Sequence, residues 1–253
     1  MKNFFKSMIT SRQREGLKAA YRKSASFFLR GRGVFCPLCG SHYRRFLNWR
    51  GRKNACCPQC GSLERTRFLY FMVISLEASR EPEGNSPVKV LHFAPEKPLS
   101  AQLKNLPQVE YLSGDIDPGR AMEVIDINRI GYPNHHFDVI LCSHVLEHLP
   151  RDDQALEEMH RVLKPGGKAF LLVPYRRKLP KTLQDDGTMS ARERKKHFGA
   201  PDHFRWYGKD FAKKLQKQGF QVFTRRVKQN FSPEEIEKYG LRENHTLFIA
   251  QKK

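Results

Sequence analysis

The sequence predicts an α/β protein with a largely parallel sheet, preceded by a small cysteine-containing module. From Val88 onward, apolar strand-like runs alternate with helix-like segments, which is the pattern of parallel strands joined by crossover helices. Two Cys-Pro-x-Cys-Gly units stand ahead of this region. With 253 residues, of which 39% are hydrophobic, the chain is long enough for one large domain and a smaller one.

The N-terminal segment, residues 1–32, is basic and is expected to be helical. Leu17, Tyr21 and Phe28 follow one another at helical spacing among basic residues. Residues 1–60 hold 14 Lys and Arg and one acid. Such a helix suits an acidic membrane surface or an acidic partner, and packing against the body of the protein is the alternative.

Four cysteines are predicted to bind one structural zinc ion. Cys36 and Cys39 form the first unit, Cys57 and Cys60 form the second, and 17 residues separate the two units. A tetrahedral zinc site takes four thiolates, and each Cys-x-x-Cys turn delivers two of them. We therefore expect a zinc ribbon with a connecting helix over residues 33–80.

The other two cysteines are expected to lie outside this site. Cys56 breaks the symmetry of the two units and is the spare thiol, although it could replace Cys57. Cys142 lies in an apolar run, where a buried and inert thiol is usual. Two disulfides are the alternative to zinc, and a reducing interior argues against them.

Aromatic and basic residues alternate between the two cysteine units. Tyr43, Phe46 and Trp49 stand among five Arg and Lys residues. Aromatic side chains that stack on bases, next to cations that meet phosphates, suit single-stranded nucleic acid. The same aromatic residues also serve to fill the core of a small module, and we keep both interpretations open.

The remaining elements follow in order. We expect a buried helix at 62–78, a linker at 79–87 and a large domain over 81–253. Within it we expect strands at 88–94, 109–117, 121–127, 137–145 and 168–174, and helices at 99–106, 154–167 and 207–219. Two late strands, 220–227 and 245–253, are expected to close the sheet as an antiparallel hairpin around a loop or short helix at 232–240.

The run FDVILCSHVLEHLPRDDQALEEMHRVLKPGGKAFLLVP, residues 137–174, resembles class I S-adenosylmethionine-dependent methyltransferases. The resemblance extends over roughly residues 88–250 of this chain. It implies a Rossmann-like seven-stranded sheet, S-adenosyl-L-methionine as the methyl donor and an unidentified methyl acceptor. The attached zinc ribbon resembles a branch of the family with no defined substrate.

The resemblance also implies the cofactor-binding residues. Asp115, at the end of the second strand, would bind the ribose hydroxyls, with Asp117 as the fallback. Asp126 and Ile127, after the third strand, would lie near the adenine, and Ser143 would begin the wall beside the methionine. A carboxylate suits the ribose because it accepts two hydrogen bonds, whereas the alternative for Asp115 is a turn-capping role.

The loop after the first strand departs from the family pattern. Family members place an acid and glycines there, whereas this chain has His92, Phe93, Ala94, Pro95 and Glu96. We hypothesise a rigid variant of the loop that still lines the cofactor pocket through His92, Ala94 and Glu96, with Glu96 neutralising the methionine ammonium. Loss of cofactor binding is the competing outcome.

Four residues are candidates for a general base, should the acceptor lose a proton. They are His144, Glu147, His148 and His203. Histidine titrates near neutral pH and is suited to this role. The alternatives are that Glu147 caps a helix and that His148 is simply hydrogen-bonded in the fold.

A long basic segment, residues 175–208, follows the fifth strand, where this fold usually places substrate loops. We hypothesise a lid over an anionic acceptor, with Arg194, Lys195 and Lys196 supplying charge, and an uncommitted flexible loop is the alternative. The predicted function is therefore methyl transfer to an unidentified acceptor, such as nucleic acid or a glycan. The alternative is a non-catalytic zinc-ribbon protein that binds nucleic acid on a degenerate methyltransferase fold.

The sequence has no run near the ~18 apolar residues that span a bilayer. Its N-terminus lacks the apolar core of a secretory signal. We therefore expect no transmembrane segment and a cytoplasmic location.

Overall fold

The N-terminal part of the chain is a helix, a ribbon of short strands and a second helix. The computed structural model describes residues 11–77 and 86–253. The elements of this part are α1 (Ser11–Phe28), β1 (Arg30–Cys36), β2 (Ser41–Tyr43), β3 (Leu47–Trp49), β4 (Arg52–Cys56) and α2 (Glu64–Glu77). β1 pairs with β2 and β3 with β4, both antiparallel. The linker expected at 79–87 lies almost entirely outside the described residues.

The rest of the chain alternates between strands and helices, as expected. Its elements are β5 (Val88–Phe93), α3 (Lys97–Lys104), β6 (Val109–Asp115), β7 (Glu123–Val124), β8 (Phe137–Ser143), the 3-10 helix η1 (Leu146–His148), α4 (Asp152–Val162), β9 (Leu163–Leu172), β10 (Leu183–Gln184), α5 (Ala191–Phe198), β11 (Arg205–Trp206), α6 (Phe211–Lys217), β12 (Phe220–Arg226), α7 (Val227–Asn230), α8 (Pro233–Lys238) and β13 (Thr246–Lys252).

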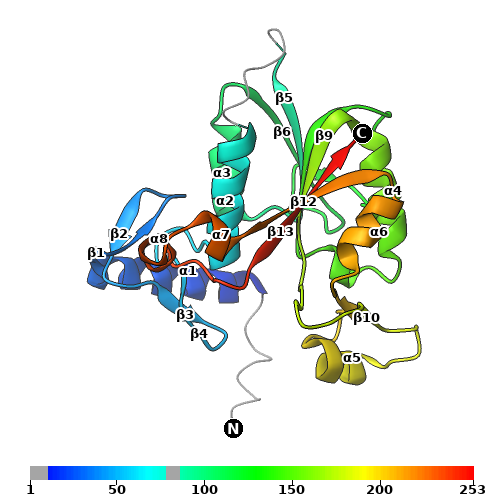
Figure 1. Cartoon of the computed structure of the whole chain (residues 1–253). Coiled ribbons are helices and arrows are strands. Elements are labelled where there is room, and N and C mark those ends of the chain that lie inside the picture. The colour runs from blue at the N-terminus through cyan, green and yellow to red at the C-terminus, as the bar shows by residue number, and fades with distance from the viewer. Residues whose placement is uncertain (1–10, 78–85) are drawn as a thin grey trace.

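A seven-stranded sheet organises this part, with the strand order β12-β13-β9-β8-β5-β6-β7. β7, β6, β5, β8 and β9 form parallel pairs, whereas β13 is antiparallel to both β9 and β12. Figure 1 shows the sheet with helices on both of its sides. The predicted seven-stranded Rossmann-like sheet and its closing antiparallel hairpin are confirmed.

The order of the strands reverses between β5 and β8. The chain moves outward from β5 through β6 to β7 and then returns to form β8 on the other side of β5. At such a switch point the loops leave in opposite directions and open a crevice at the carboxyl ends of the strands, where ligands of α/β sheets bind. The loops after β5 and β8 therefore mark the place to look for a site.

Two of the boundaries that differ from the sequence-based expectations affect the sheet. The third strand, expected over 121–127, is reduced to Glu123–Val124, whose side chains are exposed. The helix expected to reach residue 167 ends at Val162, and β9 begins at the next residue. Lys164 precedes Pro165, and a residue before proline avoids the helical conformation. The helix therefore stops before the Pro-Gly-Gly run.

The ribbon and the sheet share one hydrophobic core. A cluster of buried side chains joins Leu38 of the ribbon to Phe68 of α2 and to Val139 and Leu141 of β8. Ile140, between these two β8 residues, belongs to a second cluster that also includes residues of α4 and α6. Because strand side chains alternate in direction, the two clusters cover opposite faces of the sheet. The ribbon is thus packed against one of these faces.

Arg67 of α2 ties the ribbon to the chain after α8. Its fully buried guanidinium donates to the carbonyls of Ser62 (2.7 Å) and Ala55 (3.0 Å) in the ribbon and to those of Tyr239 (2.6 Å) and Gly240 (2.7 Å). A buried cation is stable only when its donors are satisfied in this way. Arg67 therefore fixes where the ribbon lies relative to the C-terminal strands.

Candidate active site

The loop after β5 adopts a left-handed backbone conformation at Ala94, although glycine usually occupies such a position. Ala94 has a φ of 46°, in the left-handed region, and its N–H donates to the carbonyl of Gly114 over 2.9 Å. His144, at the end of the neighbouring strand β8, has a φ of 56°. Such a conformation costs a non-glycine residue on the order of 1 kcal/mol and tends to occur at functional sites. The two strained residues follow the two strands of the switch point.

The same loop is held by a buried hydrogen-bond chain. His92 is fully buried, and its Nδ1 lies 3.0 Å from the Tyr111 hydroxyl. Its Nε2 donates to Oε2 of Glu96 over 3.0 Å. Burial alone would raise the pKa of Glu96, but the hydrogen bond and charge of His92 outweigh it, with help from the charge of Arg65, so the pKa lies below its usual value. Glu96 is therefore an anion.

Two polar atoms at this place are buried and lack partners among the described residues. They are Oε1 of Glu96 and Oγ of Ser143. An unsatisfied buried polar group is costly, and a bound ligand that supplies the missing hydrogen bonds removes that cost. A carboxylate oxygen and a hydroxyl fit the ammonium and carboxylate of an amino acid moiety such as the one in S-adenosyl-L-methionine.

The predicted cofactor acids follow β6 and β7. Asp115 closes β6, is half-buried, and accepts a hydrogen bond from the N–H of Asp117 through Oδ1 over 2.9 Å. Asp117 is exposed and pairs with Arg120 at 3.1 Å. Asp126 is exposed and accepts from the backbone and side chain of Asn128. The structure thus gives Asp115 the turn-capping contact that sequence reasoning kept as its alternative.

The remaining two predicted cofactor residues are both buried. Ile127, next to Asp126, is buried. Ser143, at the end of β8, is buried as well.

The end of β8 brings His144 and Glu147 together. His144 donates from Nδ1 to Oε1 of Glu147 over 2.7 Å, and Glu147 is fully buried. Burial alone would raise the pKa of Glu147, but the hydrogen bond from His144 outweighs this effect and holds the pKa below its usual value. Glu147 stands in the first turn of η1, and its side chain contacts His144. Its carboxylate orients the His144 ring.

The other two base candidates lie beside this pair. The rings of His148 and His203 meet edge to face, with centroids 4.7 Å apart. His148 Nδ1 pairs with Oδ2 of Asp202 at 3.1 Å, and His203 Nδ1 donates to the carbonyl of Phe198 over 3.2 Å. Burial lowers the pKa of His203. The structure therefore gathers all four base candidates at the end of β8.

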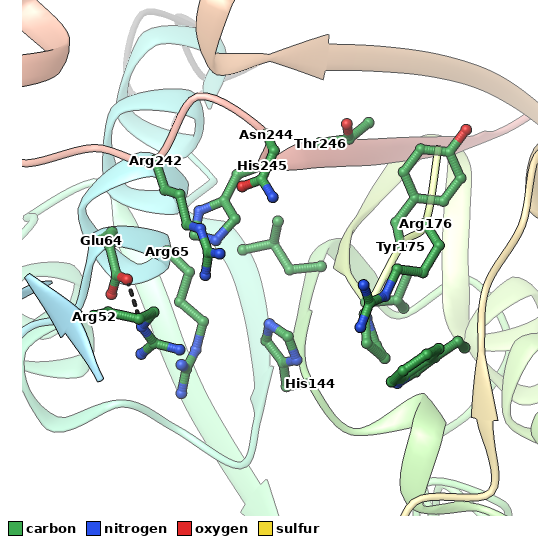
Figure 2. A pocket seen from close by; sticks show the side chains of 14 residues that line it. Arg52, Glu64, Arg65, His144, Tyr175, Arg176, Arg242, Asn244, His245 and Thr246 are labelled. Carbon is green, nitrogen blue, oxygen red and sulfur yellow. Dashed lines mark ion pairs between the residues drawn. The ribbon is translucent and has the colours of Figure 1, made fainter. Parts of the chain in front are cut away.

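An arginine-rich cavity of about 250 Å³ opens next to His144 (Figure 2). Its charged and histidine side chains are Arg52, Glu64, Arg65, His144, Arg176, Arg242 and His245. Glu64 is paired with Arg52 at 2.7 Å, which leaves the arginines in excess. The cavity thus has the charge to hold an anion.

Sequence reasoning missed most of these cavity residues. Arg52 comes from the ribbon, Arg65 from α2, and Arg242 and His245 precede β13. They converge only because the ribbon packs on the sheet, so no local pattern signals them.

Comparisons with known proteins bear on this arrangement. Residues 98–171 match the model of the methyltransferase domain family. The carbon methyltransferase CurJ aligns with 74% of this chain and 53% of its own, with 18% identity and a TM-score of 0.51. Phosphoethanolamine N-methyltransferase 2 of Haemonchus contortus, solved with S-adenosylhomocysteine, aligns with 73% of this chain and 52% of its own, with 13% identity and a TM-score of 0.50. Residues 98–171 thus match a methyltransferase domain, and the chain shares its fold with these solved methyltransferases.

Sequence relatives of this methyltransferase domain match over short stretches. The ubiquinone/menaquinone biosynthesis C-methyltransferase UbiE of Laribacter hongkongensis is 41% identical over 59 residues, which cover 22% of this chain and 24% of the relative. The chain thus spans about a quarter of the length of this relative. The [4+2]-cyclase SpnF, with a TM-score of 0.53 and 15% identity, covers 82% of this chain and 86% of its own. The last likeness shows that this fold also hosts other chemistry.

The four predicted zinc ligands ahead of the methyltransferase domain lie together. The four sulfurs all lie within 4.8 Å of one another. The distance between the sulfurs of Cys36 and Cys60 is 3.6 Å, and that between the sulfurs of Cys39 and Cys57 is 3.7 Å. Sulfurs ~2.3 Å from a tetrahedral zinc ion are ~3.8 Å apart, whereas a disulfide needs ~2.05 Å. The donor set therefore fits zinc. Cys56 is buried outside this group.

Other predictions about the ribbon and its surroundings have mixed outcomes. Tyr43 and Phe46 are buried in the ribbon core, and Trp49 is half-buried. The base-stacking interpretation of Tyr43 and Phe46 is therefore wrong, because their rings are covered by protein. Cys142 is buried, and burial raises the pKa of its thiol.

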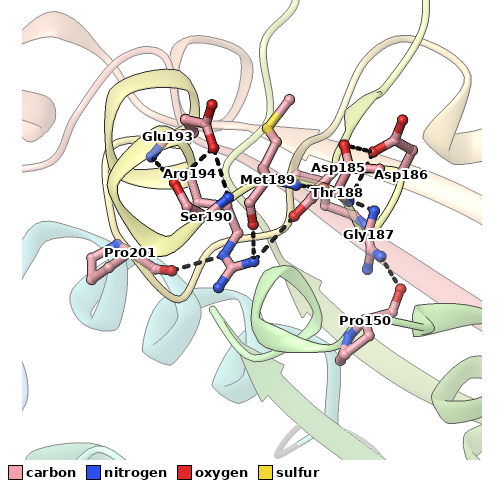
Figure 3. A network of polar contacts seen from close by, with 11 residues as sticks. Pro150, Asp185, Asp186, Gly187, Thr188, Met189, Ser190, Glu193, Arg194 and Pro201 are labelled. Atoms are coloured by element: carbon pink, nitrogen blue, oxygen red, sulfur yellow. Dashed lines mark hydrogen bonds and ion pairs between the residues drawn. The ribbon is translucent and has the colours of Figure 1, made fainter.

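The segment 175–208 is built around an internal ion pair (Figure 3). Arg194 donates to Oδ2 of Asp185 over 3.3 Å and to the carbonyls of Met189 (2.8 Å) and Pro201 (2.9 Å). Ser190 and Glu193 form a capping box that starts α5. Arg194 is thus engaged within its own segment and does not offer its charge to an acceptor.

Within the described chain, no helix is both long and apolar enough to cross a membrane.

Proposed function

We propose that the protein is an S-adenosylmethionine-dependent methyltransferase that acts on an anionic acceptor. The observation that carries the proposal is the arginine-rich cavity beside His144, at the switch point of a methyltransferase sheet. Arginine recognises phosphate, sulfate and carboxylate groups through paired N–H donors. Arg65, Arg176 and Arg242 are the residues that would hold such a group.

The cofactor would lie across the carboxyl ends of β5, β6 and β8. We assign the ribose to Asp115, the adenine to Asp126 and Ile127, and the methionine end to Glu96 and Ser143. When bound, S-adenosyl-L-methionine supplies an electrophilic methyl group on a sulfonium. The unpartnered Glu96 Oε1 and Ser143 Oγ support this assignment. Asp117 and His92 are left with supporting roles, because Arg120 and Glu96 already engage them.

His144 is the residue best placed to accept a proton from the acceptor. Its Nδ1–H is committed to Glu147, so its Nε2 carries the lone pair, and the ring lines the cavity. A carboxylate behind a histidine holds the ring and stabilises the imidazolium that proton uptake creates. Alignment of the methyl donor and the acceptor supplies the rest of the rate enhancement. Methyl transfer is an in-line displacement, and positioning of the two reactants lowers its barrier by up to ~7 to 11 kcal/mol.

The first test is calorimetric titration with S-adenosyl-L-methionine and its demethylated product. We expect micromolar binding that Asp115→Ala weakens at least tenfold and that the exposed Glu110→Gln, at the start of the same strand, leaves unchanged. Transfer of tritiated methyl to RNA, to anionic glycans and to small phosphorylated compounds then identifies the acceptor class. Absence of cofactor binding would favour the non-catalytic nucleic-acid-binding alternative. Strong salt dependence of acceptor binding would distinguish a polyanion, such as nucleic acid, from the small phosphorylated compounds.

We also propose that the four cysteines bind a structural zinc ion, which fixes the ribbon that supplies Arg52 to the cavity. The sulfur–sulfur distances support this assignment.

The exposure of apolar side chains on α1 favours an acidic membrane surface as a further partner, besides the methyl acceptor. Four apolar side chains of α1 are largely exposed, namely Leu17, Tyr21, Phe27 and Phe28. A basic helix with an exposed apolar side binds anionic lipid. Sedimentation with phosphatidylserine vesicles, compared with neutral vesicles, tests this. We expect Phe27→Ser with Phe28→Ser to abolish binding, and unchanged sedimentation of this double variant would contradict the proposal.

A further inference from the structure

A second group of metal-binding side chains lies at the end of β8. Among the described residues, one ligand atom each of Glu147, His148 and His203 lies within 4.8 Å of the others. The four-cysteine ribbon supplies none of these atoms. We propose that these three side chains bind a divalent transition-metal ion.

The buried carboxylate of Glu147 is the first argument. Glu147 is fully buried, its Oε1 accepts from His144, and its Oε2 has no hydrogen-bond partner within the described part of the chain. An anionic oxygen with an unsatisfied position inside a protein requires a compensating group. A cation held jointly with two imidazoles supplies that group.

The orientation of the two histidines is the second argument. His148 is held through Nδ1 by the Asp202 carboxylate, and His203 is held through Nδ1 by the Phe198 carbonyl. Histidines that bind metals usually have one ring nitrogen engaged in this way, which fixes the tautomer and leaves the other nitrogen for the ion. In both rings the nitrogen left for coordination is Nε2.

The donor set determines the class of ion. Two imidazoles and one carboxylate suit zinc, iron, cobalt and nickel, whereas magnesium and calcium prefer oxygen ligands. The His148 side chain is 38% exposed, so solvent can reach the site and complete the coordination shell. An ion here would join η1 to the loop that carries His203, and it would lie one hydrogen bond away from His144.

The test uses Co²⁺, whose visible absorption reports its ligands. The four-cysteine site is first filled with one equivalent of Zn²⁺, which thiolates retain, and Co²⁺ is then titrated in. We expect one Co²⁺ per chain, with weak d–d bands of nitrogen and oxygen coordination and without the sulfur charge-transfer absorption of a thiolate site. Neither S-adenosyl-L-methionine nor an acceptor is needed, so the result is independent of the proposed methyl transfer.

Matched variants give the expected and the contrary outcomes. His148→Gln and His203→Gln should each weaken Co²⁺ binding at least tenfold, and Asp202→Asn should weaken it less. His197→Gln, an exposed histidine of the same segment, should bind as the wild type does. Thermal unfolding without Co²⁺ establishes that each variant folds. Absence of d–d bands at millimolar Co²⁺, or equal bands in a double His148→Gln, His203→Gln variant, would overturn the proposal.

Discussion

His92 Nε2 lies 3.0 Å from Glu96 Oε2, and this contact joins the buried strand β5 to the N-cap residue of α3. It explains how a turn without glycine keeps one shape. Ala94 adopts the left-handed conformation, and the hydrogen bond across the turn stabilises it. The contact also leaves the second oxygen of Glu96 buried and available.

The first prediction concerns Glu96. Glu96→Gln should weaken S-adenosyl-L-methionine binding at least tenfold, because a neutral amide cannot offset the ammonium charge; tenfold corresponds to about 1.4 kcal/mol. Isothermal titration measures the effect, and Glu110→Gln is the exposed control. Unchanged affinity would remove Glu96 from the cofactor site.

The second prediction concerns the arginine-rich cavity. Sulfate and phosphate should raise the melting temperature of the protein, since an ion that binds the folded state stabilises it. Arg65→Ala and Arg242→Ala should each weaken this binding about tenfold or more, because a charge-assisted hydrogen bond is worth ~1.5 to 3 kcal/mol. Arg192→Ala, on the exposed side of α5, should behave as the wild type. Equal stabilisation of all four proteins would mean that the cavity does not bind anions.

The sequence predicted the sheet well because its strands have a local signal. β5, β8 and the last four residues of β9 are mainly apolar and buried, as expected for strands covered on both faces. The third strand was predicted too long, since Glu123 and Val124 lie exposed at the edge of the sheet and little packing holds a longer strand.

No local pattern in the sequence predicts the arginine-rich cavity or the ordered structure of the basic segment 175–208. Arg52 and Arg242 are far apart in the sequence and meet only because Arg67 fixes the ribbon. Arg194 stands in a basic run that looks solvent-exposed, but Asp185, nine residues earlier, is fully buried and pairs with it. Neither contact could be predicted without the tertiary structure.

The third prediction concerns the ribbon. Removal of zinc by a strong chelator should unfold residues 33–60, since binding free energy at such a site is folding free energy. Cys39→Ser should lose the zinc, whereas Cys56→Ala should retain it, because Cys56 lies outside the ligand group. Metal content and circular dichroism measure this. Retention of zinc by Cys39→Ser would contradict the assignment.

The fourth prediction concerns Arg194. Arg194→Ala should lower the free energy of unfolding, because it removes the cation that pairs with the Asp185 carboxylate. Lys195→Ala removes a charge from the exposed side of the same helix and should change stability little. Urea unfolding measures both. At a temperature where it remains folded, Arg194→Ala should keep its affinity for anions, and a selective loss of that affinity would restore the lid interpretation of this residue.

The fifth prediction concerns the pH dependence of stability through His245. Burial, together with the charges of the neighbouring His144, Arg242 and Arg65, lowers the pKa of His245 from 6.5 to about 3. Between these two values the unfolded chain binds the proton and the folded protein does not. The free energy of unfolding should therefore fall as the pH drops from 6.5 toward 3, by up to about 1.4 kcal/mol per pH unit.

His245→Gln, which carries no titrating group, should remove this part of the pH dependence. Urea unfolding of both proteins at pH 7, 6 and 5 gives the difference, and both retain the four cysteines, so acid loss of the thiolate ligands affects them equally. Parallel pH profiles for the two proteins would mean that His245 takes up its proton in the folded state. The cavity would then gain a cation at this position as the pH falls, and its affinity for anions should rise accordingly.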